Sequence, residues 1–197
     1  MSGVPGQRFC LYQQAQLEAV LERMAAEAAA LLVGAEDPLL LGILRRGSPL
    51  AGMLQAKLQQ RHGLAVPRFD LKLKRYGDDL TLLHPATQLT ENALFAARDL
   101  SRATLLVVDD VLYQGHSLAR VLAYLSQRGA PRIRAAVLAD RCTAQLPVHA
   151  DIVGVRLQVA PGDVVECHVP PYEEGFRIEL LRPDGDEPRP EPGFAKA

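Results

Sequence analysis

The fold is decided by the stretch Leu105-Leu-Val-Val-Asp-Asp-Val-Leu-Tyr-Gln-Gly-His-Ser117, in which an apolar run leads into two adjacent acids, a glycine-containing loop and a helical pattern. Residues 105–108 predict a strand buried on both faces, which places the two acids at its carboxyl end, where open α/β sheets bind ligands. Gly115 allows close approach of the backbone, and Ser117 can cap the helix that follows. The N–H groups and dipole of that helix suit a phosphate, and the acids suit sugar hydroxyls or a hydrated Mg²⁺. The segment therefore predicts a phosphorylated ribose as the ligand.

Two acids, a short apolar spacer and a glycine between polar residues, closing on Ser or Thr, resemble the phosphoribosyl pyrophosphate (PRPP) loop of type I phosphoribosyltransferases. The spelling Asp109-Asp-Val-Leu-Tyr113 is similar to the family of bifunctional pyrimidine-operon attenuators and uracil phosphoribosyltransferases. The resemblance extends over about residues 14–181. It implies that the loop N–H groups hold the 5′-phosphate and that the acids hold the ribose hydroxyls. The alternative is that two acids after an apolar strand are a solvated turn. The PRPP-binding residues implied are Asp109, Asp110, Val111, Leu112, Tyr113, Gln114, Gly115, His116 and Ser117.

The composition fits one domain of ordinary size. The chain has 197 residues, of which 48% are hydrophobic, and this content can build one good core. Lys plus Arg number 22 against 23 for Asp plus Glu, so no global field draws the protein to nucleic acid or to an anionic membrane. From Arg182 onward the chain is polar and dotted with prolines. This predicts a single domain over residues 1–181 and a disordered tail over residues 182–197.

The three cysteines are widely spaced and form no CxxC or Cys/His set, which favours reduced thiols and argues against a zinc site. No apolar run is long enough to span a bilayer, and the segment Met1–Arg8 lacks a basic region followed by a hydrophobic one. We therefore expect a cytoplasmic protein without a membrane partner.

Strand-like and helix-like patterns alternate along the chain with short connections. Helical spacing of apolar residues covers 13–33, and a second helix ends near Gly63 and a third near Gly129. This alternation predicts an α/β fold, a parallel sheet flanked by helices, with a small antiparallel excursion near the C-terminus. The resemblance implies the type I phosphoribosyltransferase fold with a flexible lid and a small hood. The predicted strands are residues 39–43, 68–74, 105–108, 133–138, 151–157, 164–169 and 176–181.

A second segment, Gly42-Ile-Leu-Arg-Arg-Gly-Ser-Pro-Leu-Ala51, turns a strand into a helix and is similar to the pyrophosphate loop of the family. In that loop an Arg before Gly meets the diphosphate, and the guanidinium fork suits a pair of diphosphate oxygens. The resemblance implies that Arg45, Arg46 and Gly47 bind pyrophosphate. Leu44 replaces an earlier Arg of the family, and Arg45 replaces a small polar residue. The alternative is that the two arginines belong to a solvated loop.

Between residues 75 and 100 the periodicity is lost, which predicts either a mobile functional loop or a loose hairpin. The segment Tyr76-Gly-Asp-Asp-Leu80 resembles the part of the family in which a strand leads into a loop ending in Asp-Asp-Leu. The resemblance implies a flexible lid that closes over PRPP and keeps water from its anomeric carbon. The charged residues of this lid are Lys74, Arg75, Asp78 and Asp79.

Two later segments, Val137–Arg141 and Leu146–Gly154, resemble the hood that closes over the nucleobase in this family. The family's cations that bind leader RNA are replaced here by neutral residues and one His, and the matching face of the first helix is acidic. Because RNA affinity depends on neutralising phosphates, these replacements disfavour RNA as a partner. The residues at the replaced positions are Thr143, Ala144, His149 and Val155, and the helix carries Glu22 and Glu27. The candidate nucleobase contacts are Asp140, Arg141, Val155 and Arg156.

The resemblance implies an enzyme that transfers 5-phosphoribose from PRPP to a nucleobase and releases pyrophosphate. Uracil is the expected base, Mg²⁺ bound mainly through PRPP is the expected cofactor, and a homo-oligomer is the expected assembly. The family writes Thr-Gly-Arg-Thr where this chain has Gln114-Gly-His-Ser117, so a longer amide stands beside the phosphate. Such departures leave a second reading open, a non-catalytic nucleotide-sensing or RNA-binding regulator of pyrimidine genes on the same fold.

Overall fold

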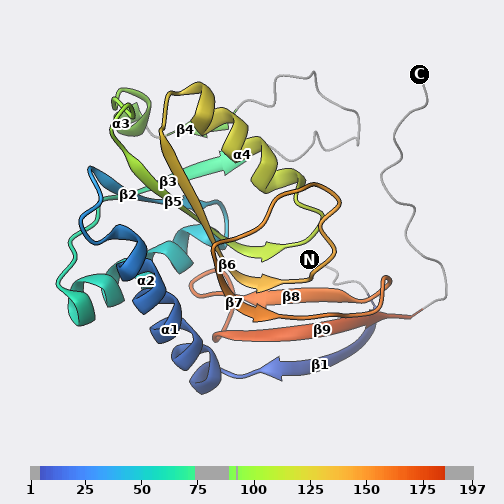
Figure 1. Ribbon diagram of the computed structural model, residues 1–197. Coiled ribbons are helices and arrows are strands. Elements are labelled where there is room, and N and C mark those ends of the chain that lie inside the picture. The colour runs from blue at the N-terminus through green and yellow to red at the C-terminus, as the bar shows by residue number, and fades with distance from the viewer. Residues whose placement is uncertain (1–4, 74–88, 92, 185–197) are drawn as a thin grey trace, which may run out of the picture.

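A six-stranded sheet forms the centre of the computed structural model, which describes residues 5–73, 89–91 and 93–184. Its strands are β2 (Pro38–Ile43), β3 (Arg68–Leu73), β4 (Leu89–Glu91), β5 (Thr104–Leu112), β6 (Arg132–Asp140) and β7 (Ile152–Arg156). Their order is β4-β3-β2-β5-β6-β7, with β4 antiparallel to β3 at one edge and the other five strands parallel. The predicted α/β fold with a parallel sheet is confirmed (Figure 1).

Helices cover both faces of this sheet (Figure 1). They are α1 (Gln14–Leu32) and α2 (Gly47–His62) on one face, and α3 (Ala93–Ala96) and α4 (His116–Gln127) on the other. Side chains of β5 alternate between two cores: Leu106 and Val108 pack with α1 and α2, whereas Leu105 and Val107 pack with α3 and α4. This burial on both faces explains the continuous apolar run. Within the described residues, none of the helices is long and apolar enough to cross a membrane.

β5 continues past its predicted end at Val108, because Val111 and Leu112 keep pairing with β6. The two acids therefore lie inside the strand, close to its carboxyl end. α4 begins directly after Gly115, which is the N-cap in a left-handed conformation with φ of 89°, and no side chain caps the helix. The prediction that Ser117 caps this helix was wrong, since Gly115 turns the chain into the helix before Ser117 is reached.

A second sheet consists of the antiparallel strands β1 (Gly6–Tyr12), β9 (Arg177–Pro183) and β8 (Val164–His168), in the order β1-β9-β8. It lies beside the end of β5, where Sγ of Cys167 is 3.9 Å from the carbonyl oxygen of Asp110. The predicted antiparallel excursion is confirmed, but its β1 strand was missed. β1 has exposed residues at its centre and depends on pairing with β9. β9 itself continues to Pro183, past the predicted domain end at residue 181.

The three free cysteines differ in exposure, which gives a simple test of the packing at β8. Cys10 and Cys142 are exposed, whereas Cys167 is buried against β5, and burial raises the pKa of its thiol. Because the thiolate is the reactive form, we expect a thiol reagent at mildly alkaline pH to titrate two cysteines in the folded protein and all three after denaturation. The Cys167→Ser variant should leave the native count unchanged. Rapid reaction of every thiol in the native protein would contradict this packing.

Candidate active site

The acid pair lies where β5 approaches the small sheet. The side chain of Asp109 is buried, and its Oδ1 accepts a hydrogen bond of 2.9 Å from the backbone N–H of Asp110. Oδ2 of Asp110 lies 3.8 Å from Nη1 of Arg46. The structure thus brings one predicted ribose-binding acid next to one predicted pyrophosphate-binding arginine, although the two are far apart in the sequence.

The pyrophosphate loop, residues 42–51, reaches β5 through a glycine. A Cβ on Gly47 would lie 2.4 Å from the carbonyl oxygen of Val108 and 3.1 Å from Cα of Asp109. Any side chain at this position would therefore push the loop away from the acid pair. Gly47 is the first residue of α2 and Arg46 is its N-cap, so the same close contact places Arg46 beside the acids.

Arg46 makes its closest contacts with Glu173, which the sequence analysis did not identify. Nε and Nη2 of Arg46 lie 3.0 and 2.6 Å from Oε1 of Glu173. The hydrogen bond to Glu173 raises the pKa of Arg46 despite partial burial, with a smaller contribution from Asp110. No local pattern announces Glu173, since it lies in the connection between β8 and β9 and is 127 positions away from Arg46.

The PRPP loop, residues 109–117, is packed against the hood segment that follows β6. A Cβ on Gly115 would lie 2.5 Å from Cγ2 of Val148, and the N–H of Gln145 donates to the carbonyl of Gln114 at 3.0 Å. The first N–H groups of a helix have no partner within the helix, and no side chain caps α4. The backbone at this end of α4 can therefore donate to a phosphate.

Arg141 connects the hood to the PRPP loop. Its buried guanidinium lies 4.2 Å from the ring centroid of Tyr113, and Nη2 donates to the carbonyl oxygen of Asp163 at 2.8 Å. Burial lowers the pKa of Arg141, with smaller opposing contributions from Tyr113 and Asp163. This predicted base contact thus also holds two loops together through a cation–π contact.

The other predicted hood and lid residues have different surroundings. Asp140 is at the end of β6, where its Oδ1 accepts the N–H of Cys142. Val155 is buried in the core shared with α1, whereas Arg156 is exposed. The lid residues Lys74, Arg75, Asp78 and Asp79 lie outside the described residues. The segment that carries them joins β3 to its antiparallel neighbour β4.

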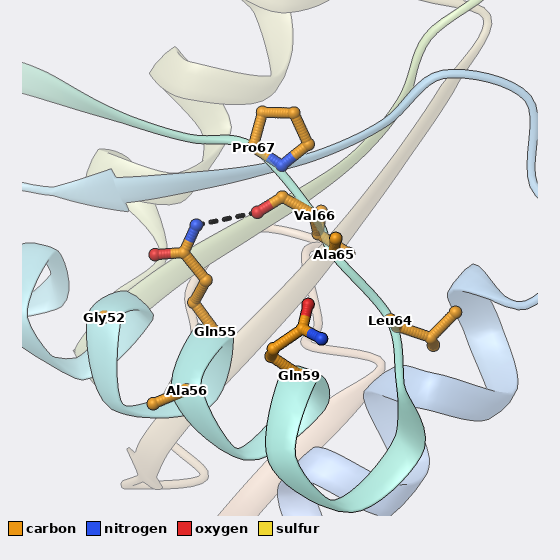
Figure 2. A pocket seen from close by; sticks show the side chains of 8 residues that line it. All are labelled: Gly52, Gln55, Ala56, Gln59, Leu64, Ala65, Val66 and Pro67. Carbon is orange, nitrogen blue, oxygen red and sulfur yellow. Dashed lines mark hydrogen bonds between the residues drawn. The ribbon is translucent and has the colours of Figure 1, made fainter.

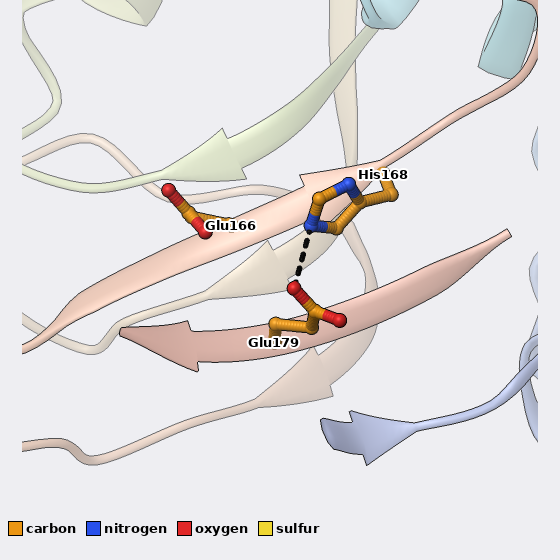
Figure 3. A group of neighbouring side chains, drawn as sticks. All are labelled: Glu166, His168 and Glu179. Atoms are coloured by element: carbon orange, nitrogen blue, oxygen red, sulfur yellow. Dashed lines mark ion pairs between the residues drawn. The ribbon is translucent and has the colours of Figure 1, made fainter. Parts of the chain in front are cut away.

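A separate group of titratable side chains lies on β8 and β9. Oxygens of Glu166 and Glu179 and a nitrogen of His168 lie within 4.8 Å of one another (Figure 3). Each glutamate already has a cation: Arg8 lies 3.2 Å from Glu166, and Arg177 lies 2.7 Å from Glu179. We interpret this group as a charge-balanced ion-pair network that supports the small sheet.

A surface hollow of about 410 Å³ lies between α2 and the segment that leads into β3 (Figure 2). Gln55 crosses it and donates to the carbonyl of Val66 at 2.7 Å. None of the predicted site residues lines this hollow. The predicted pyrophosphate-binding and PRPP-binding residues instead lie where β2 and β5 end.

The chain matches the model of the phosphoribosyl transferase domain over residues 10–174. A relative from Deinococcus radiodurans, named bifunctional protein PyrR, is 34% identical over 170 residues, which are 86% of this chain and 92% of the relative. The protein of the same name from Roseiflexus sp. (strain RS-1) is 40% identical over 135 residues, which are 68% of this chain and 73% of the relative.

Solved structures are also similar to this chain. Hypoxanthine phosphoribosyltransferase from Trypanosoma cruzi, in complex with the product IMP, has a TM-score of 0.70 and 16% identity, covering 93% of this chain and 94% of that one. A hypoxanthine-guanine phosphoribosyltransferase from Bacillus anthracis has a TM-score of 0.67 and 13% identity, covering 91% and 99%. At these identities the likeness shows the shared fold alone.

Proposed function

Since this chain belongs to the type I phosphoribosyltransferase family, we propose that it transfers the 5-phosphoribosyl group of PRPP to uracil and releases pyrophosphate. The observation that carries this proposal is the approach of Arg46 to Asp110, with Nη1 and Oδ2 3.8 Å apart. A donor that carries a ribose and a diphosphate needs an acid and a cation side by side, and these residues meet that requirement.

In the proposed reaction the main role of the protein is to position the phosphate, ribose and diphosphate groups of PRPP. The N–H groups at the start of α4 would hold the 5′-phosphate, the acid pair would hold the ribose hydroxyls, and Arg46 would stabilise the departing diphosphate. The transition state would resemble an oxocarbenium ion, so exclusion of water matters more than a side-chain nucleophile. The anomeric centre would be inverted.

Magnesium fits the same acids. Asp109 and Asp110 supply the carboxylate oxygens that Mg²⁺ prefers, and PRPP would supply the remaining oxygens together with water. When bound, the metal would neutralise charge on the diphosphate as it leaves. The fit rests on the hard-oxygen donors of the two adjacent side chains.

Uracil rests on the resemblance of the PRPP loop to the bifunctional pyrimidine-operon attenuator and uracil phosphoribosyltransferase family. The solved structures include hypoxanthine phosphoribosyltransferases, so purine bases remain candidate substrates. Enzymes that act on purines and enzymes that act on pyrimidines share this fold. A pyrimidine edge can be recognised by backbone groups of the hood, so the side chains there do not decide between the bases.

We also propose that RNA is disfavoured as a partner. The exposed hood residues Thr143 and His149 carry no fixed positive charge. On α1, Glu22 is paired with Lys57 and Arg61, so this face is better described as charge-balanced than as acidic. Neither these hood residues nor this face of α1 offers many unpaired cations that could neutralise RNA phosphates.

An assay of pyrophosphate release tests the proposal. With PRPP and Mg²⁺, we expect uracil to support turnover with a kcat/KM at least about tenfold above that of hypoxanthine, guanine, adenine or orotate, a preference of about 1.4 kcal/mol in transition-state binding. Faster turnover with a purine would support phosphoribosyltransferase activity but contradict uracil as the substrate. Tight nucleotide binding without turnover on any base would favour a sensor, and tight binding of leader RNA with a steep salt dependence would restore an attenuator.

A further inference from the structure

Two consecutive residues after β8 contact the two consecutive arginines of the pyrophosphate loop. The ring of Tyr172 lies 5.1 Å from the guanidinium carbon of Arg45, and Glu173 accepts two hydrogen bonds from Arg46. These contacts join the small sheet directly to the start of α2. Both guanidinium groups of this arginine pair therefore have a partner in the segment that joins β8 to β9.

Glu173 is itself held in place. Its Oε2 accepts the backbone N–H of Val169 at 3.1 Å, and the turn is closed by the N–H of Tyr172, which donates to the carbonyl of Val169 at 3.2 Å. The side chain of Glu173 is only 17% exposed. Moving this carboxylate away would break a hydrogen bond to the backbone as well as the contact with Arg46.

The hydrogen bonds to Glu173 use one edge of the Arg46 guanidinium. Nε and Nη2 both point to Oε1, which leaves Nη1 as the nitrogen nearest to Asp110. A guanidinium has two edges that can each bind an anion in a bidentate manner. With one edge fixed by the protein, the other is oriented towards the acid pair.

We infer that Glu173 is a positioning residue for the pyrophosphate subsite: it holds Arg46 so that the edge of the guanidinium that faces Asp110 can also meet the diphosphate. This inference rests on the proposed function, because it takes Arg46 as the group that binds the diphosphate. In this proposal Glu173 acts through Arg46 and does not itself bind the ribose or the base.

The carboxylate of Glu173 is ionised at neutral pH, because its pKa is lowered. Burial alone would raise the pKa of Glu173, but the hydrogen bonds from Arg46 and from the Val169 N–H, with the nearby charges of Arg46 and His168, lower it below its ordinary value. The alternative is that Glu173 competes with the diphosphate for Arg46. In that case the Glu173 carboxylate would have to move away from Arg46 when the diphosphate binds. The backbone anchor at Val169 and the low exposure of Glu173 favour a permanent clamp over such a competitor.

The inference is tested by comparing ligands with and without a diphosphate. In Glu173→Ala we expect the Kd of pyrophosphate and the KM of PRPP to rise about two- to tenfold, because an unrestrained arginine side chain loses its freedom only on binding. The Kd of UMP, which lacks the diphosphate, should change less than about twofold and also reports that the variant is folded. Glu173→Gln keeps an acceptor for Arg46 and should lie between Ala and the wild type.

The matched control is Glu174→Gln, the same chemical change at the exposed neighbouring position, which should leave both constants unaltered. In an Arg46→Ala background, removal of Glu173 should have no further effect on pyrophosphate, since the clamp has nothing left to hold. Unchanged or tighter pyrophosphate binding in Glu173→Ala, beside a wild type that binds it, would overturn the clamp and leave the proposed function intact. A wild type that binds neither pyrophosphate nor PRPP would overturn both.

Discussion

Replacing Asp109 and Asp110 together by Asn is expected to weaken PRPP binding by at least about 100-fold. Each hydrogen bond to a charged group is worth roughly 1.5–3 kcal/mol, so losing two costs about 3 kcal/mol or more. Oδ1 of Asp109 accepts the N–H of Asp110, and the amide oxygen of Asn can keep this local contact. The double variant should therefore lose affinity for the ribose of PRPP and for Mg²⁺, whereas strand β5 should stay folded. Isothermal titration with PRPP and Mg²⁺ measures it directly.

The control for this double variant is Asp99→Asn, the same substitution at an exposed carboxylate that accepts hydrogen bonds from Ser101. It should bind PRPP like the wild type. Circular dichroism melting of the double variant distinguishes lost recognition from lost folding. Equal PRPP affinity in the double variant and the wild type would remove the basis of the assigned site.

Substituting Gly47 by Ala is expected to damage both stability and function. The new Cβ would lie 2.4 Å from the backbone oxygen of Val108, and neither the start of α2 nor β5 can yield easily, because both are buried. Overpacking of this kind costs about 1–3 kcal/mol, which corresponds to a fall in Tm of roughly 2–12 °C in a domain of this size. Relief of the clash moves Arg46 away from Asp110, so pyrophosphate binding should weaken as well.

Gly162→Ala is the matched control, since a Cβ there meets no atom within 4 Å. Its free energy of unfolding should stay within about 0.5 kcal/mol of the wild type. Thermal melting and pyrophosphate titration of the two variants side by side give the comparison. If Gly47→Ala melts and binds like Gly162→Ala, the pyrophosphate loop does not sit against β5 as described.

The central sheet was predictable because parallel strands covered on both faces leave an unmistakable pattern. Leu105 to Val108 point alternately into two cores, so every position must be apolar. Burial of the acids that follow costs free energy unless they have partners, which led to the prediction that a ligand binds at this end of the sheet. The pyrophosphate loop could be placed near them, because the loops that end neighbouring parallel strands meet at one edge.

Other parts of the site depend on contacts that no local pattern encodes. Glu173 and Arg46 meet only because the small sheet folds back against β5, and the acid of a Glu-Glu pair in a turn looks like any solvated residue. β1 shows no buried face, so its pairing with β9 is visible only in three dimensions. The predicted ends of some elements also differ from the observed ones. Gly115, through its left-handed φ, starts α4 before Ser117.

The pairing of β1 with β9 joins segments from opposite ends of the described chain. During synthesis residues 6–12 leave the ribosome before residues 177–183, so β1 cannot pair with β9 until the later segment has emerged. The parallel sheet can begin to form on the nascent chain, whereas the small sheet that carries the Arg46 clamp must close after translation of β9 is complete. A growing polypeptide would therefore form the strand that carries Asp109 and Asp110 before the contact between Glu173 and Arg46 is in place.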